Sequence, residues 1–403
     1  MKSLFIVNIL SLILGYYREI FILNEFGTSI LTDTYVLINR IVIGINLELY
    51  IMFTAFFILN LASKNNRYAY GSFQKFILLV SFLQTFLLLV NIYYLDRLNI
   101  DTILSSILLA ILPFFTIAIS YYRSIYELKV KKYLYGTLLK PLTSLFIIIC
   151  ILLYKDYLSI FLIVCSIFLA YLAMYIWGRV FIDKSSNSKS IKLSLIDIFN
   201  EPKLNTLIKF ALISQVIILI DIFILSFLGE GALSNFHYSS MFYVLLLFFY
   251  TSIIITYYFP KLVNLFNKYD LYKIRIKVNK IILISVIIYI PILLLAYLFI
   301  DDVLLIIFNE KVDIDAMVKT IYLLFILVIP SIFKEIIKTY FRVINRDNIN
   351  VSIQYIYMYI KIIIVIPLTY IYGWDGFIIS FILVNIIVPL VYIYKYIDIQ
   401  WQE

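Results

Sequence analysis

The sequence predicts an all-α polytopic membrane protein, with about 12 transmembrane helices in two parallel six-helix lobes. Three observations predict this class: an apolar composition, connections that alternate in charge, and a stretch that recurs at the start of each half. Hydrophobic residues make up 64% of the 403 residues and charged residues 14%, and the mean hydropathy is +1.02. Because a soluble domain is about 45–50% apolar and about 25% charged, an ordinary globular protein is excluded.

The predicted helices are apolar stretches of about 20 residues, the length that crosses a hydrocarbon core about 30 Å thick. They lie at 4–24, 33–62, 73–95, 101–122, 134–154, 157–181, 205–228, 233–260, 280–300, 317–341, 351–372 and 376–396.

Charges in the connections test this helix count independently. Connections after even-numbered helices are basic, for example those holding Lys131 and Lys132, or Lys273 and Arg275. Connections after odd-numbered helices hold mostly acids: Glu25, Asp96, Asp101, Glu230, Asp301, Asp302, Glu310, Asp313, Asp315 and Asp375. Since basic connections stay in the cytoplasm, we expect both termini and every even-numbered connection on that side.

A repeated stretch marks the start of each half. EIFILNEFGTSILTD begins at Glu19 and DIFILSFLGEGALSN begins at Asp221, and six of the fifteen positions are identical, Gly27 and Gly229 among them. The polar stretch 183–204 separates six predicted helices from six. We therefore expect an N-terminal lobe at 1–182, a cytoplasmic linker at 183–204 and a C-terminal lobe at 205–403, related as a parallel repeat.

Several chemistries are excluded by what the sequence lacks. Cys150 and Cys165 lie in apolar segments without spacing partners, which argues against a zinc site or a disulfide framework. His237 is the only histidine, and no glycine-rich phosphate-binding loop is present. We expect no enzyme activity, no catalytic residue and no metal.

Twelve charged residues are candidates for the interior of the bilayer, where a charge costs about 2.5–3.5 kcal/mol on insertion scales and therefore faces a cavity or a partner. Lys140 and Lys209 can reach the interface from near the cytoplasmic ends, and Glu335 and Lys338 can neutralise each other at i,i+3. The other eight are the candidate site residues. They are the cations Arg18, Arg40, Lys334 and Lys361 and the carboxylates Glu19, Asp33, Glu48 and Asp221. We interpret them as the lining of a polar central cavity between the lobes. The alternative is a set of buried ion pairs that only stabilise helix packing.

The stretch SLILGYYREIFILNEFGTSILTDTYVLINRI (11–41) resembles the opening of the MurJ/MviN proteins in its Gly, Arg–acid pair, apolar run, Phe-Gly and Thr-Asp. SQVIILIDIFILSFLGEGALSNFHYSS (214–240) resembles the start of their second half, and TYFRVINRDN (339–348) is similar to the segment after their tenth helix. These proteins belong to the multidrug/oligosaccharidyl-lipid/polysaccharide (MOP) exporter superfamily. The resemblance implies two lobes that move undecaprenyl-diphosphate-linked sugars from the cytoplasmic to the outer leaflet by alternating access.

Two departures from the MurJ pattern favour a different branch. Leu12, Asn46 and Met241 occupy positions where that pattern places arginines. MurJ proteins also carry two further helices, whereas twelve is the usual count in Wzx-type flippases. We therefore expect a Wzx-like flippase for an O-antigen, capsule or similar repeat unit in a bacterial inner membrane. The alternatives are a lipid II flippase of peptidoglycan synthesis, a MATE-type cation-coupled drug exporter and a non-transporting scaffold.

On this interpretation Arg18 and Arg40 bind the diphosphate first, helped by Lys334 or Lys361. Glu19 and Asp221 either orient those cations or take a coupling ion, Na⁺ or H⁺, and no other cofactor is expected. Asp33 and Glu48 are further cavity carboxylates. The expected partners are the lipid-linked sugar, membrane lipids, and a polysaccharide polymerase or glycosyltransferases, with no nucleic acid.

Overall fold

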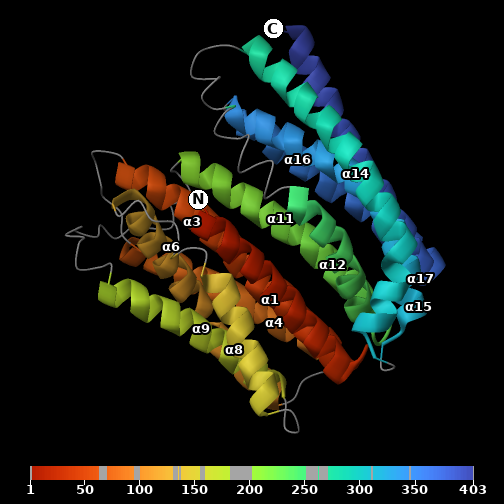
Figure 1. Ribbon diagram of the computed structural model, residues 1–403. Coiled ribbons are helices and arrows are strands. Elements are labelled where there is room, and N and C mark those ends of the chain that lie inside the picture. Colours follow the sequence, from red (N-terminus) through yellow and green to blue (C-terminus); the bar gives the residue numbers. More distant parts are fainter. Residues whose placement is uncertain are drawn as a thin grey trace. The chain divides into compact units, whose positions relative to one another are not determined.

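The computed structural model describes residues 2–62, 70–94, 100–129, 135, 138–154, 159–181, 202–250, 262, 271–309, 312–344 and 346–402. Within these ranges all regular structure is helical (Figure 1). The chain divides into two compact units, Met1–Gln215 (unit 1) and Val216–Glu403 (unit 2). Residues 183–201 of the predicted linker lie outside the described residues.

Unit 1 is built from α1 (Lys2–Phe26), α2 (Ile30–Ile38), the π-helix η1 (Asn39–Ile43), α3 (Gly44–Ala62), the short 3₁₀ helix η2 (Tyr70–Phe73), α4 (Gln74–Tyr94), α5 (Ile100–Leu109), α6 (Leu112–Lys129), α8 (Leu139–Leu153) and α9 (Ile160–Phe181). Helix α11 (Pro202–Phe227) begins in unit 1 and ends in unit 2. Unit 2 continues with α12 (Ala232–Tyr250), α14 (Leu271–Ile307), α15 (Ile314–Phe325), α16 (Val328–Val343) and α17 (Asp347–Gln402).

Several predicted helices are bent or broken, and the long helix α17 consists of two helical arms that meet at a turn. The α15–α16 pair bends by 47°. Helix α17 contains Gly373 at φ 59° and ψ −131°, a non-helical backbone. Tyr357 on one side of Gly373 donates to Asn385 on the other over 3.0 Å, so the two arms of α17 lie side by side.

Joining the bent pairs and separating the arms of α17 gives twelve successive segments in the described chain: α1, α2–α3, α4, α5–α6, α8, α9, α11, α12, α14, α15–α16 and the two arms. This agrees with the predicted count. By length and apolarity, seven described stretches could each span a membrane, or eight with the bent pair; one of them, Asn348–Asp398, covers both arms.

The repeated stretches share a backbone feature. Gly27 and Gly229 follow the first helix of each half and have positive φ angles, 64° and 118°. Glycine adopts this region without the steric cost that a Cβ brings. The aligned glycines therefore end α1 and α11 in a similar way.

Helices α3 and α6 of unit 1 pack against each other, and a row of small polar residues on α6 faces α3. Thr116, Ser120 and Ser124 recur every four residues, so they share one face of α6. Thr116 donates to the Asn46 side chain over 2.8 Å. The hydroxyls of Ser120 and Ser124 donate to carbonyls within α6, those of Thr116 and Ser120, over 2.7 and 2.8 Å. The same hydroxyls lie 3.2 Å from the carbonyl oxygens of Tyr50 and Thr54 on α3. Small hydroxyl residues let two membrane helices approach closely and bond across the contact.

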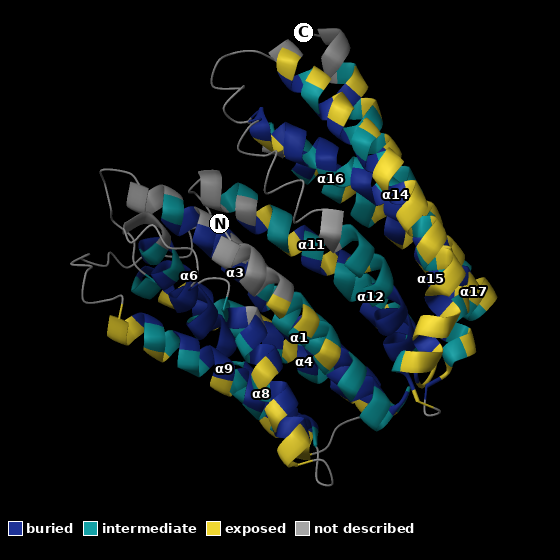
Figure 2. Ribbon diagram, in the orientation of Figure 1, coloured by how far each residue is buried: buried dark blue, intermediate teal, exposed yellow. Residues whose placement is uncertain are grey.

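Helix α14 is a long apolar helix that is exposed along much of its length. It runs for 37 residues, beyond the predicted 280–300 on both sides, because hydropathy marks only the part within hydrocarbon. Its exposed residues are mostly large and apolar (Figure 2). A long exposed apolar surface of this kind is typical of a contact with a membrane or another protein.

Candidate functional site

The predicted residues of unit 1 form a cluster on α1 and α2. Arg18 and Glu19 form an ion pair, although neighbouring helix residues point to different faces; the long arginine side chain reaches its neighbour. The Tyr35 hydroxyl donates to the same Glu19 oxygen over 2.9 Å, and the Asn39 amide lies 3.4 Å from it. Glu19 is only 4% exposed, so these groups replace water around its charge.

Arg40 lies in the π-helix η1, directly after Asn39, the first residue of η1, whose amide contacts Glu19. Asp33 and Arg40 are seven positions apart, a spacing that places two residues on one stripe of a regular α-helix. The π-turn instead begins at Asn39 and changes the register there. Single π-turns inside α-helices are frequent at functional sites.

The other two candidate carboxylates of unit 1 are Asp33 and Glu48. Asp33 lies in the first turn of α2 and is fully buried. Glu48 lies within α3, but its side chain is outside the described residues.

In unit 2 the structure joins two predicted residues that are 140 positions apart. Nζ of Lys361, on α17, lies 2.5 Å from Oδ2 of Asp221, on α11. The same Nζ donates to the Ile217 carbonyl over 3.0 Å. The Lys361 side chain is 1% exposed and the Asp221 side chain 15%, so the ammonium is buried and the carboxylate is partly accessible.

Lys334 lies on α16, after the bend in the broken helix. Its Nζ is 4.0 Å from Oε1 of Glu335, whose other oxygen is 3.4 Å from Nζ of Lys338. The Lys334 and Lys338 side chains are 23% and 18% exposed. This group carries more positive than negative charge and is partly accessible.

Asn46, at a position where the resemblance places an arginine, is a packing residue in this fold. It is 0% exposed. Its amide donates to the side chain of Gln84 and its carbonyl accepts from Thr116, both over 2.8 Å. These bonds hold it inside the α3–α6 core.

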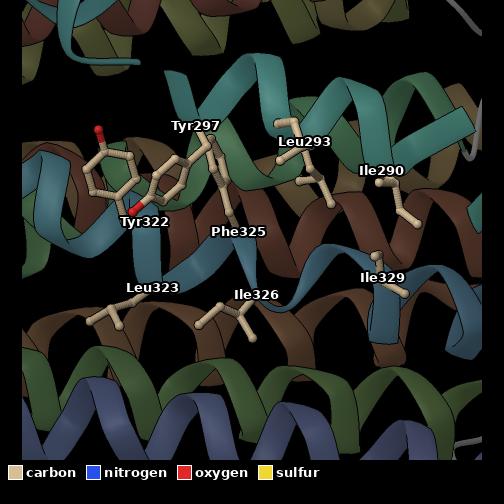
Figure 3. A pocket seen from close by; sticks show the side chains of 9 residues that line it. Ile290, Leu293, Tyr297, Tyr322, Leu323, Phe325, Ile326 and Ile329 are labelled. Carbon is tan, nitrogen blue, oxygen red and sulfur yellow. The ribbon is translucent and has the colours of Figure 1, made fainter. Parts of the chain in front are cut away.

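An apolar groove of about 440 Å³ lies between α14 and the bent pair (Figure 3). At one end of the groove the ring centroids of Tyr297 and Tyr322 are 4.4 Å apart. The Tyr322 hydroxyl donates a hydrogen bond to the Asp301 carboxylate over 2.8 Å. The groove offers no charged side chain for a head group, because its lining is Ile290, Leu293, Leu294, Tyr297, Tyr322, Leu323, Phe325, Ile326 and Ile329.

Taken residue by residue, the structure pairs Arg18 with Glu19 and Lys361 with Asp221, and leaves Lys334 in a separate basic group. Sequence reasoning missed Tyr35, Asn39 and Tyr357, which complete the two ion-pair clusters. Their signal was a polar group in an apolar span, but tyrosine is too common in this chain to single out.

No protein-family profile and no curated protein sequence matches the chain. Solved structures match it over nearly its whole length. A lipid II flippase MurJ in an inward closed conformation is 19% identical, with 98% of this chain and 87% of that chain covered and a TM-score of 0.77. An inward-facing multidrug resistance MATE family transporter of the MOP superfamily is 13% identical, with 97% and 94% covered and a TM-score of 0.72.

A MOP superfamily transporter from Pyrococcus furiosus is 12% identical, with 99% and 96% covered and a TM-score of 0.64. The chain therefore has the all-helical fold that MurJ and MATE transporters share, as the sequence predicted. This fold and the long apolar helices indicate an integral membrane protein.

Proposed function

We propose that this protein is a flippase that moves undecaprenyl-diphosphate-linked oligosaccharide, such as an O-antigen or capsule repeat unit, from the cytoplasmic to the outer leaflet. One observation carries the proposal. The central acid of each first helix, Glu19 or Asp221, is already neutralised by a basic side chain. The partly accessible charges, Arg40 and the Lys334 group, are mainly cationic and suit an anionic substrate.

The physical task explains why cations are needed. A sugar head group cannot cross lipid alone, because each buried hydroxyl without a partner costs about 1–3 kcal/mol. The diphosphate adds negative charge, which hydrocarbon excludes more strongly. Arginine forks and lysine ammonium groups can replace its water with charge-assisted hydrogen bonds.

In the proposed mechanism Arg18 and Arg40 bind the diphosphate first, helped by Lys334. Lys361 is less suited to this role than its sequence position implied, because its ammonium is buried against Asp221. Alternating access then exposes the site to one leaflet at a time. We propose that the protein works in a bacterial inner membrane with both termini in the cytoplasm, beside a polymerase or glycosyltransferases.

Two rival functions share the fold. A lipid II flippase would have to bind its diphosphate without an arginine at Asn46, which is held in the core. A MATE-type exporter of cationic drugs would use carboxylates, and Glu19 and Asp221 are occupied by cations. The paired carboxylates argue against the exporter, and the asparagine at position 46 departs from the MurJ pattern.

The test is mass spectrometry of polyprenyl-diphosphate lipids from cells depleted of the protein. We expect an oligosaccharide lipid to accumulate while lipid II stays at its normal level. Accumulation of lipid II would instead make the protein a peptidoglycan-precursor flippase. If neither lipid accumulates and depleted cells retain more of a cationic dye, the exporter reading replaces the proposal.

A further inference from the structure

Sequence reasoning left two roles open for Asp221: to orient a basic side chain or to take a coupling cation. In the structure one of its carboxylate oxygens contacts a basic side chain of the same unit. Nζ of Lys361 lies 2.5 Å from Asp221 Oδ2 and 3.0 Å from the carbonyl oxygen of Ile217, one helical turn earlier. Two oxygens of α11 therefore meet at a single ammonium group.

The other neighbours of this ammonium are also groups that attract a cation. Nζ lies 5.4 Å from the ring centroid of Tyr357 and 5.7 Å from that of Phe381. Aromatic faces within about 6 Å attract cations electrostatically. The Tyr357 hydroxyl is turned to Asn385, over 3.0 Å, which holds its ring in place. A carboxylate, a carbonyl and two rings therefore surround this ammonium with groups that attract a cation.

The ammonium end of this ion pair is closed to solvent, whereas the Asp221 side chain is 15% exposed. The Lys361 side chain is 1% exposed, so its ammonium fills the space between these groups. A second cation beside Asp221 would lie close to the ammonium in a medium of low dielectric, where like charges repel strongly. Among the described residues, no group of three or more His, Cys, Asp or Glu side chains is placed to hold a metal ion.

We infer that the ammonium of Lys361 is the resident cation of unit 2, and that no alkali ion binds at Asp221. A lysine supplies one positive charge on a flexible stem, so it neutralises the carboxylate as Na⁺ would but cannot leave the protein. What the inference says about energy coupling rests on the proposed transport function. What it says about cation binding at Asp221 does not depend on that function.

The test measures cation binding through thermal stability, because a ligand that binds only the folded state raises the unfolding midpoint. The full-length protein in neutral detergent is unfolded in NaCl, in KCl and in N-methyl-D-glucamine chloride at equal ionic strength. We expect the wild-type midpoint to be the same in all three salts. A wild-type midpoint that rises in NaCl, and no longer rises in Asp221→Asn, would overturn the inference. A rise that persists in Asp221→Asn places the ion elsewhere, and the inference stands.

Truncation of the resident cation supplies the second arm. Lys361→Ala empties the place of the ammonium but keeps the Asp221 carboxylate and the Ile217 carbonyl. We expect a lower midpoint in N-methyl-D-glucamine, with recovery in Na⁺ or methylammonium, and no recovery in the matched double variant Lys361→Ala/Asp221→Asn. A folded Lys361→Ala protein that no small cation stabilises would contradict the inference. If this variant does not fold, the wild-type and Asp221→Asn arm decides, and neither arm needs a lipid substrate.

Discussion

Replacing Arg18 with alanine separates substrate binding from helix packing in unit 1. The change removes the ion pair with Glu19, but the buried carboxylate keeps the Tyr35 hydroxyl at 2.9 Å and the Asn39 amide at 3.4 Å. Loss of one hydrogen bond to a charged group costs about 1.5–3 kcal/mol. This loss of stability is smaller than that of a buried charge left without any partner, which is about 3–5 kcal/mol. We therefore expect the variant to insert and fold.

The expected effect on transport is larger than the effect on folding implies. If the Arg18 guanidinium binds the diphosphate, losing about 1.5–3 kcal/mol of that contact lowers transport on the order of 10- to 100-fold. The assay compares transport per folded molecule with the free energy of unfolding in detergent. The matched control is Tyr35→Phe, which removes another bond to Glu19 but no cation. It should cost stability and keep transport.

Two results would refute this reasoning. A folded Arg18→Ala variant that transports as well as the wild type would show that Arg18 does not bind substrate. If Arg18→Ala does not fold while Arg18→Lys folds and transports normally, the arginine is a packing residue that any cation can replace.

Three further predictions concern stability. Asp221→Asn leaves the Lys361 ammonium without its carboxylate and should lower the free energy of unfolding by about 3–5 kcal/mol; adding Lys361→Met should recover most of this loss, and a larger loss in the double variant would contradict us. Thr116→Val removes a hydrogen-bond donor to the buried Asn46 side chain and should lower the free energy of unfolding by about 1–3 kcal/mol, with transport per folded molecule unchanged. A loss of transport without a loss of stability would show that the Thr116–Asn46 bond acts in transport itself. Gly373→Ala puts a Cβ at φ 59° and ψ −131° and should cost about 1–3 kcal/mol in thermal unfolding experiments; an unchanged midpoint would count against the turn at this residue.

Much of the fold could be predicted because bilayer physics acts on local sequence. Apolar length and loop charge predicted the twelve segments, and the repeat predicted that Gly27 and Gly229 hold equivalent places, where both have positive φ. The breaks were harder to predict. The bend between α15 and α16 begins at Ile326, four residues before Pro330, where proline removes a helical hydrogen bond, so this break has a sequence signal. The π-turn at 39–43 contains no proline.

The partners of the buried charges could not be predicted from sequence. Hydropathy shows that a charge in a span needs a partner, but it does not say which one. Lys361 and Asp221 are 140 residues apart and meet only through the packing of α11 and α17. Arg18 and Glu19 are adjacent, and helix geometry predicted that they diverge; the length of the arginine side chain reverses that expectation.

The central claim is that this chain moves a diphosphate-linked sugar lipid between leaflets. The most direct test reconstitutes the purified protein in liposomes with undecaprenyl diphosphate carrying a fluorescent N-acetylhexosamine, and adds a membrane-impermeant quencher outside. We predict that quenching extends from the outer-leaflet fraction to nearly all of the lipid, and that Arg18→Ala liposomes behave like protein-free ones. Quenching limited to the outer leaflet with folded wild-type protein, for this lipid and for oligosaccharide lipids extracted from the source cells, would contradict the account.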